Sequence, residues 1–261
     1  MIDARHAAQV AEQAAYAAGT HLLASRSRLA AAPITRRQPG EIADDVERET
    51  GDLVREVVLR PFPDHGVLVE PANALVHEGR PLWVVIPLDG RTNYERGHPQ
   101  YAVSIALVVD GEPLVGVVYD PCRNEFFGAI RGRGAVLNGM PIRCATPRSL
   151  LDAHAATVFP QPVSGRMAAY MAELGRVLRA FGGVRRSGSM ALAMAHLAAG
   201  RTHAYWEHDL DRWTAAAGIL LLRESGAVIE ARDHEPLLLS RSLLACTPGL
   251  RGSFLDLLSP A

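Results

Sequence analysis

The sequence has few cysteines and no closely spaced pair of them. Its three cysteines, Cys122, Cys144 and Cys246, lie far apart along the 261 residues, which argues against a disulfide framework or a zinc site. No run approaches the roughly 20 apolar residues of a membrane helix. The first segment, 1–30, carries charges throughout, unlike a signal peptide. These absences favour a cytoplasmic protein with no membrane partner.

The sequence also lacks an excess of charge of one sign. Lys and Arg total 27 and Asp and Glu total 28, for a net charge of -1, so no general attraction to nucleic acid is expected. The local basic pairs Arg36–Arg37 and Arg185–Arg186 leave a local contact with nucleic acid open. Hydrophobic residues make up 48% and charged residues 21%, which is typical of a globular protein.

Periodicity predicts a helix pair, then a β-meander, then alternating strands and helices. Helices are expected near 4–30, 44–60, 165–181, 188–199, 211–224 and 249–258. Strands are expected near 67–69, 83–86, 102–109, 114–119, 125–130, 154–158, 202–206, 226–230 and 243–246. The only candidate boundary lies near 145–152, where the meander gives way to alternating strands and helices. We therefore expect one unit, 1–261, with approximate halves 1–150 and 151–261, built from stacked layers of sheet and helix.

The segment from Trp83 to Asn93 is the most informative one. A buried strand, 83–86, runs directly into a loop that carries Asp89 and Gly90. A carboxylate at such a strand end can be held against a cation, and backbone N–H groups around the glycine can face an anion. Taken alone, the spacing is more often that of an ordinary Asp-Gly turn.

Three other segments allow an ordinary and a functional interpretation. Glu70 ends the preceding strand, where a solvated carboxylate is the commoner case. Arg185 to Ser189 opens a helix with Gly and Ser, which suits a plain N-cap or an anion site. Tyr205 to Gly218 joins an acidic loop to a helix of small residues, which suits tight packing.

Taken together and in this order, these segments resemble the inositol monophosphatase family. The family pattern runs GEE, WxxDPxDGTxN, VSI…GVVxxP…GxGAxxNG, RxxGSAA and YWExxLxxWDxAAG. The matching segments here are Glu70, Trp83–Asn93, Val103–Ile105, Gly116–Pro121, Gly132–Gly139, Arg185–Ala191 and Tyr205–Gly218. The resemblance implies a mixed α and β fold, a layered αβαβα sandwich like those of inositol monophosphatase and fructose-1,6-bisphosphatase, and a homodimer.

The resemblance also implies a Mg²⁺-dependent hydrolase of phosphate monoesters, in which metal ions polarise the phosphate and activate water. Carried onto this sequence, the family's ligand positions fall on Glu70, Ile86, the backbone carbonyl of Leu88, Asp89 and Thr214. Two of the four carboxylates are therefore replaced. Ile86 has no side-chain oxygen, and Thr214 has one neutral oxygen, so Glu70 and Asp89 are the remaining catalytic candidates. A single weak Mg²⁺ held by these two and by substrate stays open.

The resemblance also assigns the family's substrate-binding positions to residues of this sequence. The phosphate-facing and ring-facing positions are Gly90, Arg91, Thr92, Gly188, Ser189 and Glu207. Arg91 replaces a threonine of the family and adds a cation where metal ions would lie. It could pair with Asp89 or Glu70, bind a phosphate, or point to solvent. An aspartate of the family's second helix has a candidate in Asp45.

Three functions follow as hypotheses. The first is a weak or inactive phosphatase for inositol phosphate or a similar sugar phosphate. The second is a non-catalytic protein that binds a phosphorylated ligand or a protein partner in a regulatory role, because one bacterial branch of the family acts in ribosomal RNA transcription. The third is a changed chemistry at His208, Asp209 or Asp211, although a lone histidine in a polar loop is usually solvated.

Overall fold

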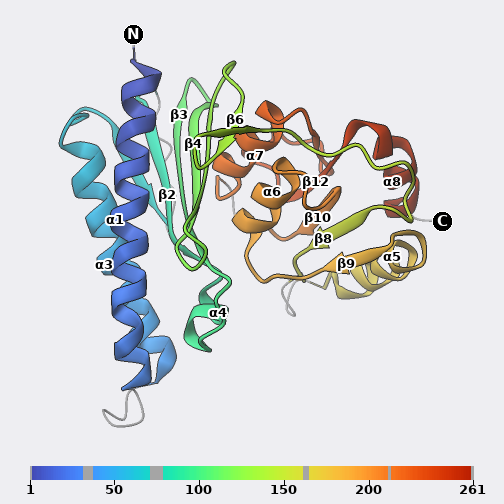
Figure 1. The fold of residues 1–261 in the computed structure, drawn as a ribbon, viewed down its shortest axis with the longest axis horizontal. Coiled ribbons are helices and arrows are strands. Elements are labelled where there is room, and N and C mark those ends of the chain that lie inside the picture. Colours follow the sequence, from blue (N-terminus) through green and yellow to red (C-terminus); the bar gives the residue numbers. More distant parts are fainter. Residues whose placement is uncertain (1, 32–37, 71–78, 161–164, 211–212, 260–261) are drawn as a thin grey trace.

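The computed structural model describes residues 2–31, 38–70, 79–160, 165–210 and 213–259. Two long helices, α1 (Ala4–Ala30) and α3 (Pro39–Leu59), form the first layer (Figure 1). Asp3 caps α1 because its carboxylate accepts a hydrogen bond from the backbone N–H of Arg5 at 2.9 Å. Small side chains such as Ala11 and Ala14 are fully buried, which lets α1 lie close to the sheet beneath it.

Within the described residues, the first sheet has seven strands in sequential order. They are β1 (Gly66–Val69), β2 (Leu82–Asp89), β3 (Ala102–Val109), β4 (Glu112–Asp120), β5 (Glu125–Ile130), β6 (Ala135–Leu137) and β7 (Met140–Ile142). Only the β1–β2 pair is parallel, and the others are antiparallel. Strand β2 has a register shift between Ile86 and Asp89. Pro87, which has no N–H for the ladder, lies within that shift.

The second sheet has five strands within the described residues, in the order β11-β12-β10-β8-β9. They are β8 (His154–Thr157), β9 (Gly183–Arg185), β10 (Ala204–His208), β11 (Val228–Ala231) and β12 (Ser242–Cys246). Helices α6 (Met190–Ala198) and α7 (Ala216–Glu224) lie between the two sheets, and α5 (Met167–Ala180) and α8 (Arg251–Leu258) cover the outer face (Figure 1).

Each interface between layers has its own apolar core. Val46 and Trp83 belong to the core beneath α1 and α3. Leu192 and Leu221 belong to the core around α6 and α7, which also includes residues of both sheets. Tyr170, Trp206 and Phe254 form part of the outer core. The order of layers is therefore αβαβα, and the predicted fold class is confirmed. None of the described helices is both long enough and apolar enough to cross a membrane.

The structure differs from the predicted elements mainly at short segments. Helix α3 begins at Pro39 rather than near 44, because Gln38 and Glu41 form a capping box around a proline in the first turn. The loop expected after Asp89 contains a short helix, α4 (Arg91–Glu95). The short strands β6, β7 and β9 were not expected. Helix α7 begins at Ala216 rather than near 211, because Trp213 has a left-handed φ of 74°. Asp211 and Arg36–Arg37 lie outside the described residues.

Candidate functional site

At the end of β2, the side chain of Asp89 faces α6 and that of Arg91 faces α3. Gly90 lies between them with a φ of 89°, a conformation that favours glycine. A Cβ added at Gly90 would lie 2.7 Å from the backbone oxygen of Gln100, so the position has no room for a side chain. The chain reverses at Gly90 and enters α4.

The carboxylate of Asp89 lies against the N-terminus of α6. Its Oδ2 accepts a hydrogen bond from the hydroxyl of Ser189 and another from the backbone N–H of Ala191, at 2.8 Å. Ser189 also caps α6, because its Oγ accepts from the N–H of Leu192 at 3.2 Å. Asp89 is half-buried as a residue, but its carboxylate lies deep. Burial raises the pKa of Asp89, and the hydrogen bond from Ser189 opposes that rise.

Asn93 joins α4 to the loop that precedes α6. Its side-chain N–H₂ donates to the carbonyl of Gln100 at 2.7 Å and to that of Ser187 at 2.8 Å. Gly188 has a φ of 81°, and a Cβ there would lie 2.8 Å from the amide nitrogen of Asn93. A glycine at 188 therefore lets this loop approach Asn93, which places Gly188 and Ser189 beside Asp89.

A cavity of about 230 Å³, here called the central cleft, lies beside Asp89. It brings together seven of the residues that the sequence singles out, His208 and Asp209 among them. Its lining includes Ile86, Asp89, Gly188, Glu207 and Thr214, together with Val158, Phe159, Met190, His208, Asp209 and Leu210. The cleft is thus formed by β2, the start of α6 and the end of β10 with the loop that follows.

Glu207 and His208, at the end of β10, are both buried. Glu207 accepts a hydrogen bond from the hydroxyl of Tyr205. The ring of His208 lies 2.9 Å from Glu173 and 3.0 Å from both Arg232 and Ser242. The expectation that His208 is solvated is therefore wrong, because packing of β10 against β12 and α5 encloses the ring.

Glu173 and Arg232 were not singled out from the sequence, yet they form an ion pair in which the carboxylate is buried and the guanidinium half-buried. Arg232 Nη2 lies 2.6 Å from Glu173 Oε1. Burial by itself would raise the pKa of Glu173, but hydrogen bonds from His208 and Arg232 lower it below its usual value. The two residues lie 59 positions apart and belong to no motif, so no local signal could have linked them. Asp209 pairs with Arg166 at 3.2 Å.

A second cavity of about 290 Å³, here called the acidic groove, contains two more of the predicted residues, Glu70 and Arg91. It is lined by Asp44, Glu47, Arg48, Asp52, Arg55, Val69, Glu70 and Arg91. Glu70 follows β1, where its N–H donates to the carbonyl of Val85 at 2.9 Å. Glu70 and Asp89 therefore line different cavities. Asp45 points elsewhere, with ion pairs to Arg48 at 3.3 Å and Arg28 at 3.8 Å.

Arg91 is held by carboxylates of α3 and α4. Its Nη1 lies 2.6 Å from Asp44 and 3.0 Å from Glu47, and its Nε lies 3.0 Å from Glu95. Its Nη2 donates to the carbonyl of Gly40 at 3.0 Å. The hydrogen bond with Asp44 is the largest cause of a raised pKa of Arg91. Arg91 thus pairs with carboxylates of α3 and α4, a contact that was not among the alternatives considered for it from the sequence.

The described side chains do not fit a centre for two or three Mg²⁺ ions. Such a centre needs several oxygen ligands around each ion. Nowhere in the described ranges do three or more His, Cys, Asp or Glu side chains converge as metal ligands. Ile86 presents only hydrocarbon to the central cleft, Thr214 presents one hydroxyl, and Glu70 lines the acidic groove. Thr92 is exposed on α4, and the side chain of Leu88 is buried in the core beneath α1.

Comparison with known proteins shows close relatives over most of the chain. It is 39% identical over 223 residues to a Nus factor SuhB from Xylella fastidiosa, covering 85% of this chain and 81% of that protein. It is 34% identical over 242 residues to an inositol-1-monophosphatase from Synechocystis sp., covering 92% of this chain and 84% of that protein.

Solved structures show the same fold. An inositol monophosphatase from Anabaena matches with a TM-score of 0.84 at 32% identity, covering 98% of this chain and 96% of that one. An extragenic suppressor protein suhB from Bartonella henselae matches with a TM-score of 0.84 at 31% identity, covering 96% of this chain and 98% of that one. A family model described as the inositol monophosphatase family matches residues 3–258. The chain therefore belongs to the inositol monophosphatase family.

Proposed function

We propose that this protein binds a phosphorylated polyol or sugar in the central cleft and hydrolyses it weakly or not at all. The observation that carries the proposal is the position of Asp89. Its Oδ2 accepts hydrogen bonds from Ser189 and from the N–H of Ala191, so this oxygen already serves the packing of α6 against the first sheet. A carboxylate used in this way has less capacity to hold a cation.

The separation of the two remaining carboxylates supports weak hydrolysis. Glu70 lines the acidic groove and Asp89 lines the central cleft. Among the described residues, no group of three or more His, Cys, Asp or Glu side chains could hold a metal ion, whereas Mg²⁺ prefers about six oxygen ligands. Ile86 adds an apolar wall to the cleft in place of a third carboxylate.

Ligand binding is supported by the groups that remain in the cleft. Glu207 is buried and positioned by Tyr205, and its carboxylate can accept hydrogen bonds from sugar hydroxyls. Gly188 brings backbone close to the cleft without a side chain. A pocket with a few fixed polar groups among apolar walls is typical of sites for small molecules.

The test combines binding and turnover on the same protein. Calorimetry with myo-inositol 1-phosphate, glucose 6-phosphate and fructose 1,6-bisphosphate is expected to show binding, and Glu207→Gln is expected to weaken it about tenfold. The matched control, Glu235→Gln, removes an exposed carboxylate outside the central cleft. Absence of binding for all three compounds would overturn the ligand assignment.

Turnover is measured as phosphate released from the same compounds with Mg²⁺ or Mn²⁺. Rapid release by the wild-type protein that Asp89→Asn abolishes would overturn weak hydrolysis. The double variant Ile86→Asp/Thr214→Asp restores both family carboxylates and is expected to raise Mg²⁺ affinity. If it does not, loss of these two ligands does not explain the weak site.

A second candidate function rests on the relatives named Nus factor SuhB. By this alternative, the protein binds a protein partner in a regulatory role. It predicts partner-dependent stabilisation that is unchanged by Glu207→Gln. Purified Nus factors from the same cell provide the partners, and failure of all of them to bind would remove this alternative.

A further inference from the structure

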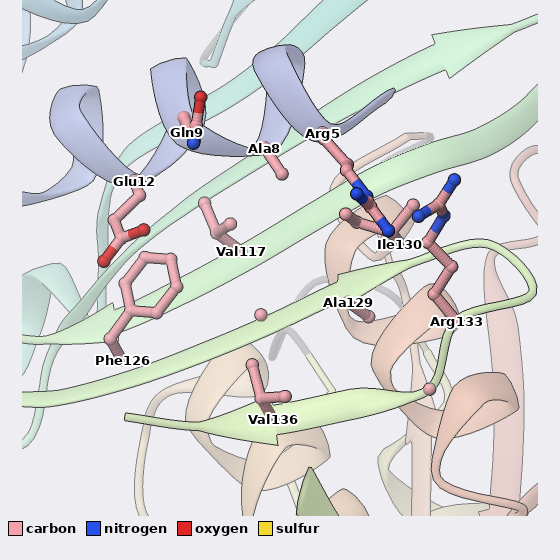
Figure 2. A pocket seen from close by; sticks show the side chains of 12 residues that line it. Arg5, Ala8, Gln9, Glu12, Val117, Phe126, Ala129, Ile130, Arg133 and Val136 are labelled. Atoms are coloured by element: carbon pink, nitrogen blue, oxygen red, sulfur yellow. The ribbon is translucent and has the colours of Figure 1, made fainter. Parts of the chain in front are cut away.

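A third cavity, of about 330 Å³, lies between the N-terminal half of α1 and strands β4, β5 and β6 (Figure 2). We call it the α1 pocket. Its floor and walls are apolar, with Ala8 of α1 above Val117, Phe126, Ala129, Ile130 and Val136. It shares no lining residue with the central cleft or the acidic groove. Its volume is within the range of sites that enclose small molecules.

The floor of the α1 pocket is built from fixed groups. Phe126 stacks on Tyr16 of α1 with ring centroids 5.5 Å apart and an angle of 23°. Gly128 leaves the middle of the floor open, and a Cβ there would lie 3.0 Å from the ring of Phe126. Phe126 is itself buried, so its ring is held in the floor by the packing between α1 and β5.

Two guanidinium groups, of Arg5 and Arg133, lie at one end of the pocket (Figure 2). The backbone of each is fixed. Arg5 follows the Asp3 cap of α1. Arg133 lies in a turn whose flanking N–H groups, of Gly132 and Gly134, each donate to Glu224 at 2.7 Å.

Most other arginines near the sites described above bind carboxylates within the fold, as Arg91 and Arg232 do. In contrast, neither guanidinium at the α1 pocket has a hydrogen bond or ion pair among the residues that the structure describes. Two adjacent cations beside an apolar floor are complementary to an anionic group on an apolar body.

The opposite end of the pocket carries the carboxylate of Glu12 (Figure 2). Arg5 and Glu12 are seven residues apart on α1, which corresponds to about 10 Å along the helix axis. A ligand that spans this distance would place its anionic group near the arginines, and Glu12 would repel a second anion at its far end.

We propose that the α1 pocket binds a medium-chain monocarboxylate, with the carboxylate at Arg5 and Arg133 and the hydrocarbon chain on the floor formed by Phe126, Ala129 and Val136. Guanidinium groups bind carboxylates through paired N–H donors. Apolar contact along the chain supplies the remaining affinity. This site is separate from the central cleft, so the proposal does not depend on the activity proposed there.

The test is calorimetry of the full-length protein with octanoate, with octan-1-ol and with octanedioate as probes. Octanoate is expected to bind, and octan-1-ol is expected to bind at least tenfold more weakly because it lacks the charge. Arg5→Gln and Arg133→Gln are each expected to weaken octanoate binding about tenfold. The matched control is Arg131→Gln, which removes an exposed arginine from the same turn but not from the pocket lining.

The proposal fails if octanoate does not bind, if octan-1-ol binds equally well, or if Arg131→Gln weakens binding as much as Arg133→Gln. Octanedioate, which has a carboxylate at each end, tests whether the far end of the bound chain lies near Glu12. It is expected to bind the wild-type protein more weakly than octanoate, and Glu12→Gln is expected to remove that difference. An unchanged difference in Glu12→Gln would overturn the assigned orientation. Glu207→Gln, in the central cleft, is expected to leave octanoate binding unchanged, which separates this test from that of the proposed function.

Discussion

The central cleft and the acidic groove both contain carboxylates, but the fold uses them differently. Around the central cleft, Asp89 and Glu173 are bound by groups that belong to buried layers of the fold. In the acidic groove, Asp44 and Glu47 surround Arg91, whose side chain is 35% exposed. The carboxylates near the cleft are therefore part of the packing, whereas those in the groove form a partly exposed network.

The difference begins at a single residue. Asp89 and Arg91 are separated only by Gly90, whose left-handed conformation reverses the chain. As a result, the carboxylate faces α6 and the guanidinium faces α3. Asp89 therefore lines the central cleft, whereas Arg91, two residues later, lines the acidic groove. This arrangement explains why Arg91 pairs with carboxylates of α3 and α4 although it lies only two residues from Asp89 in the sequence.

The strongest test of the comparison is Arg232→Leu. This change leaves the buried carboxylate of Glu173 without its cation, and we expect a loss of about 3–5 kcal/mol in the free energy of unfolding. Urea denaturation measures it. The control is Arg241→Leu, at an exposed position, with an expected change below about 0.5 kcal/mol. Equal effects of the two changes would break the distinction between buried and surface pairs.

The next test is Asp89→Ala, which removes the acceptor for Ser189 and for the N–H of Ala191. We expect a loss of about 2–3 kcal/mol in the free energy of unfolding, because two donors at the start of α6 lose their partner. Asp89→Asn keeps one acceptor oxygen and is expected to cost less. A stability unchanged by Asp89→Ala would show that Asp89 is not part of the packing and would reopen its assignment as a metal ligand.

A smaller effect is expected for Arg91→Leu in the acidic groove. The ion pairs of Arg91 are partly exposed, so we expect a loss of about 1 kcal/mol. Because the network is screened by salt, the loss should shrink as ionic strength rises. Denaturation at low and high salt measures both. A loss as large as that of Arg232→Leu, independent of salt, would contradict the description of the groove as a partly exposed network.

The smallest expected effect is a dependence of stability on acid pH. The pKa of Glu173 is lowered in the fold from its usual 4.5, so its ionised form favours the folded state. That contribution is present above the unfolded pKa and is lost as the pH falls through the lowered folded value. Glu173→Gln should therefore reduce the loss of stability on acidification. The measurement is the free energy of unfolding of the wild-type protein and of Glu173→Gln as a function of pH. Equal slopes for the two would contradict this role of Glu173.

The major elements could be predicted because their signals are local. The helical spacing of alanines predicts α1, and the β-branched runs on either side of Asp110–Gly111 predict β3 and β4, all of which the structure confirms. The short helix α4 was missed because Asp89-Gly90-Arg91 has the composition of a turn. The short strands β6 and β9 were missed because three-residue strands depend on pairing with distant neighbours.

By itself, the sequence determined the order of motifs, the family and the layered fold, and through the resemblance it predicts that Ile86 and Thr214 replace carboxylates. These properties depend on residue identity and on local periodicity. Only the tertiary structure decided that Asp89 binds the start of α6, that Arg91 pairs with α3, and that Glu70 lines another cavity. Such contacts join residues up to 102 positions apart, and their partners are set by how the layers pack rather than by spacing along the chain.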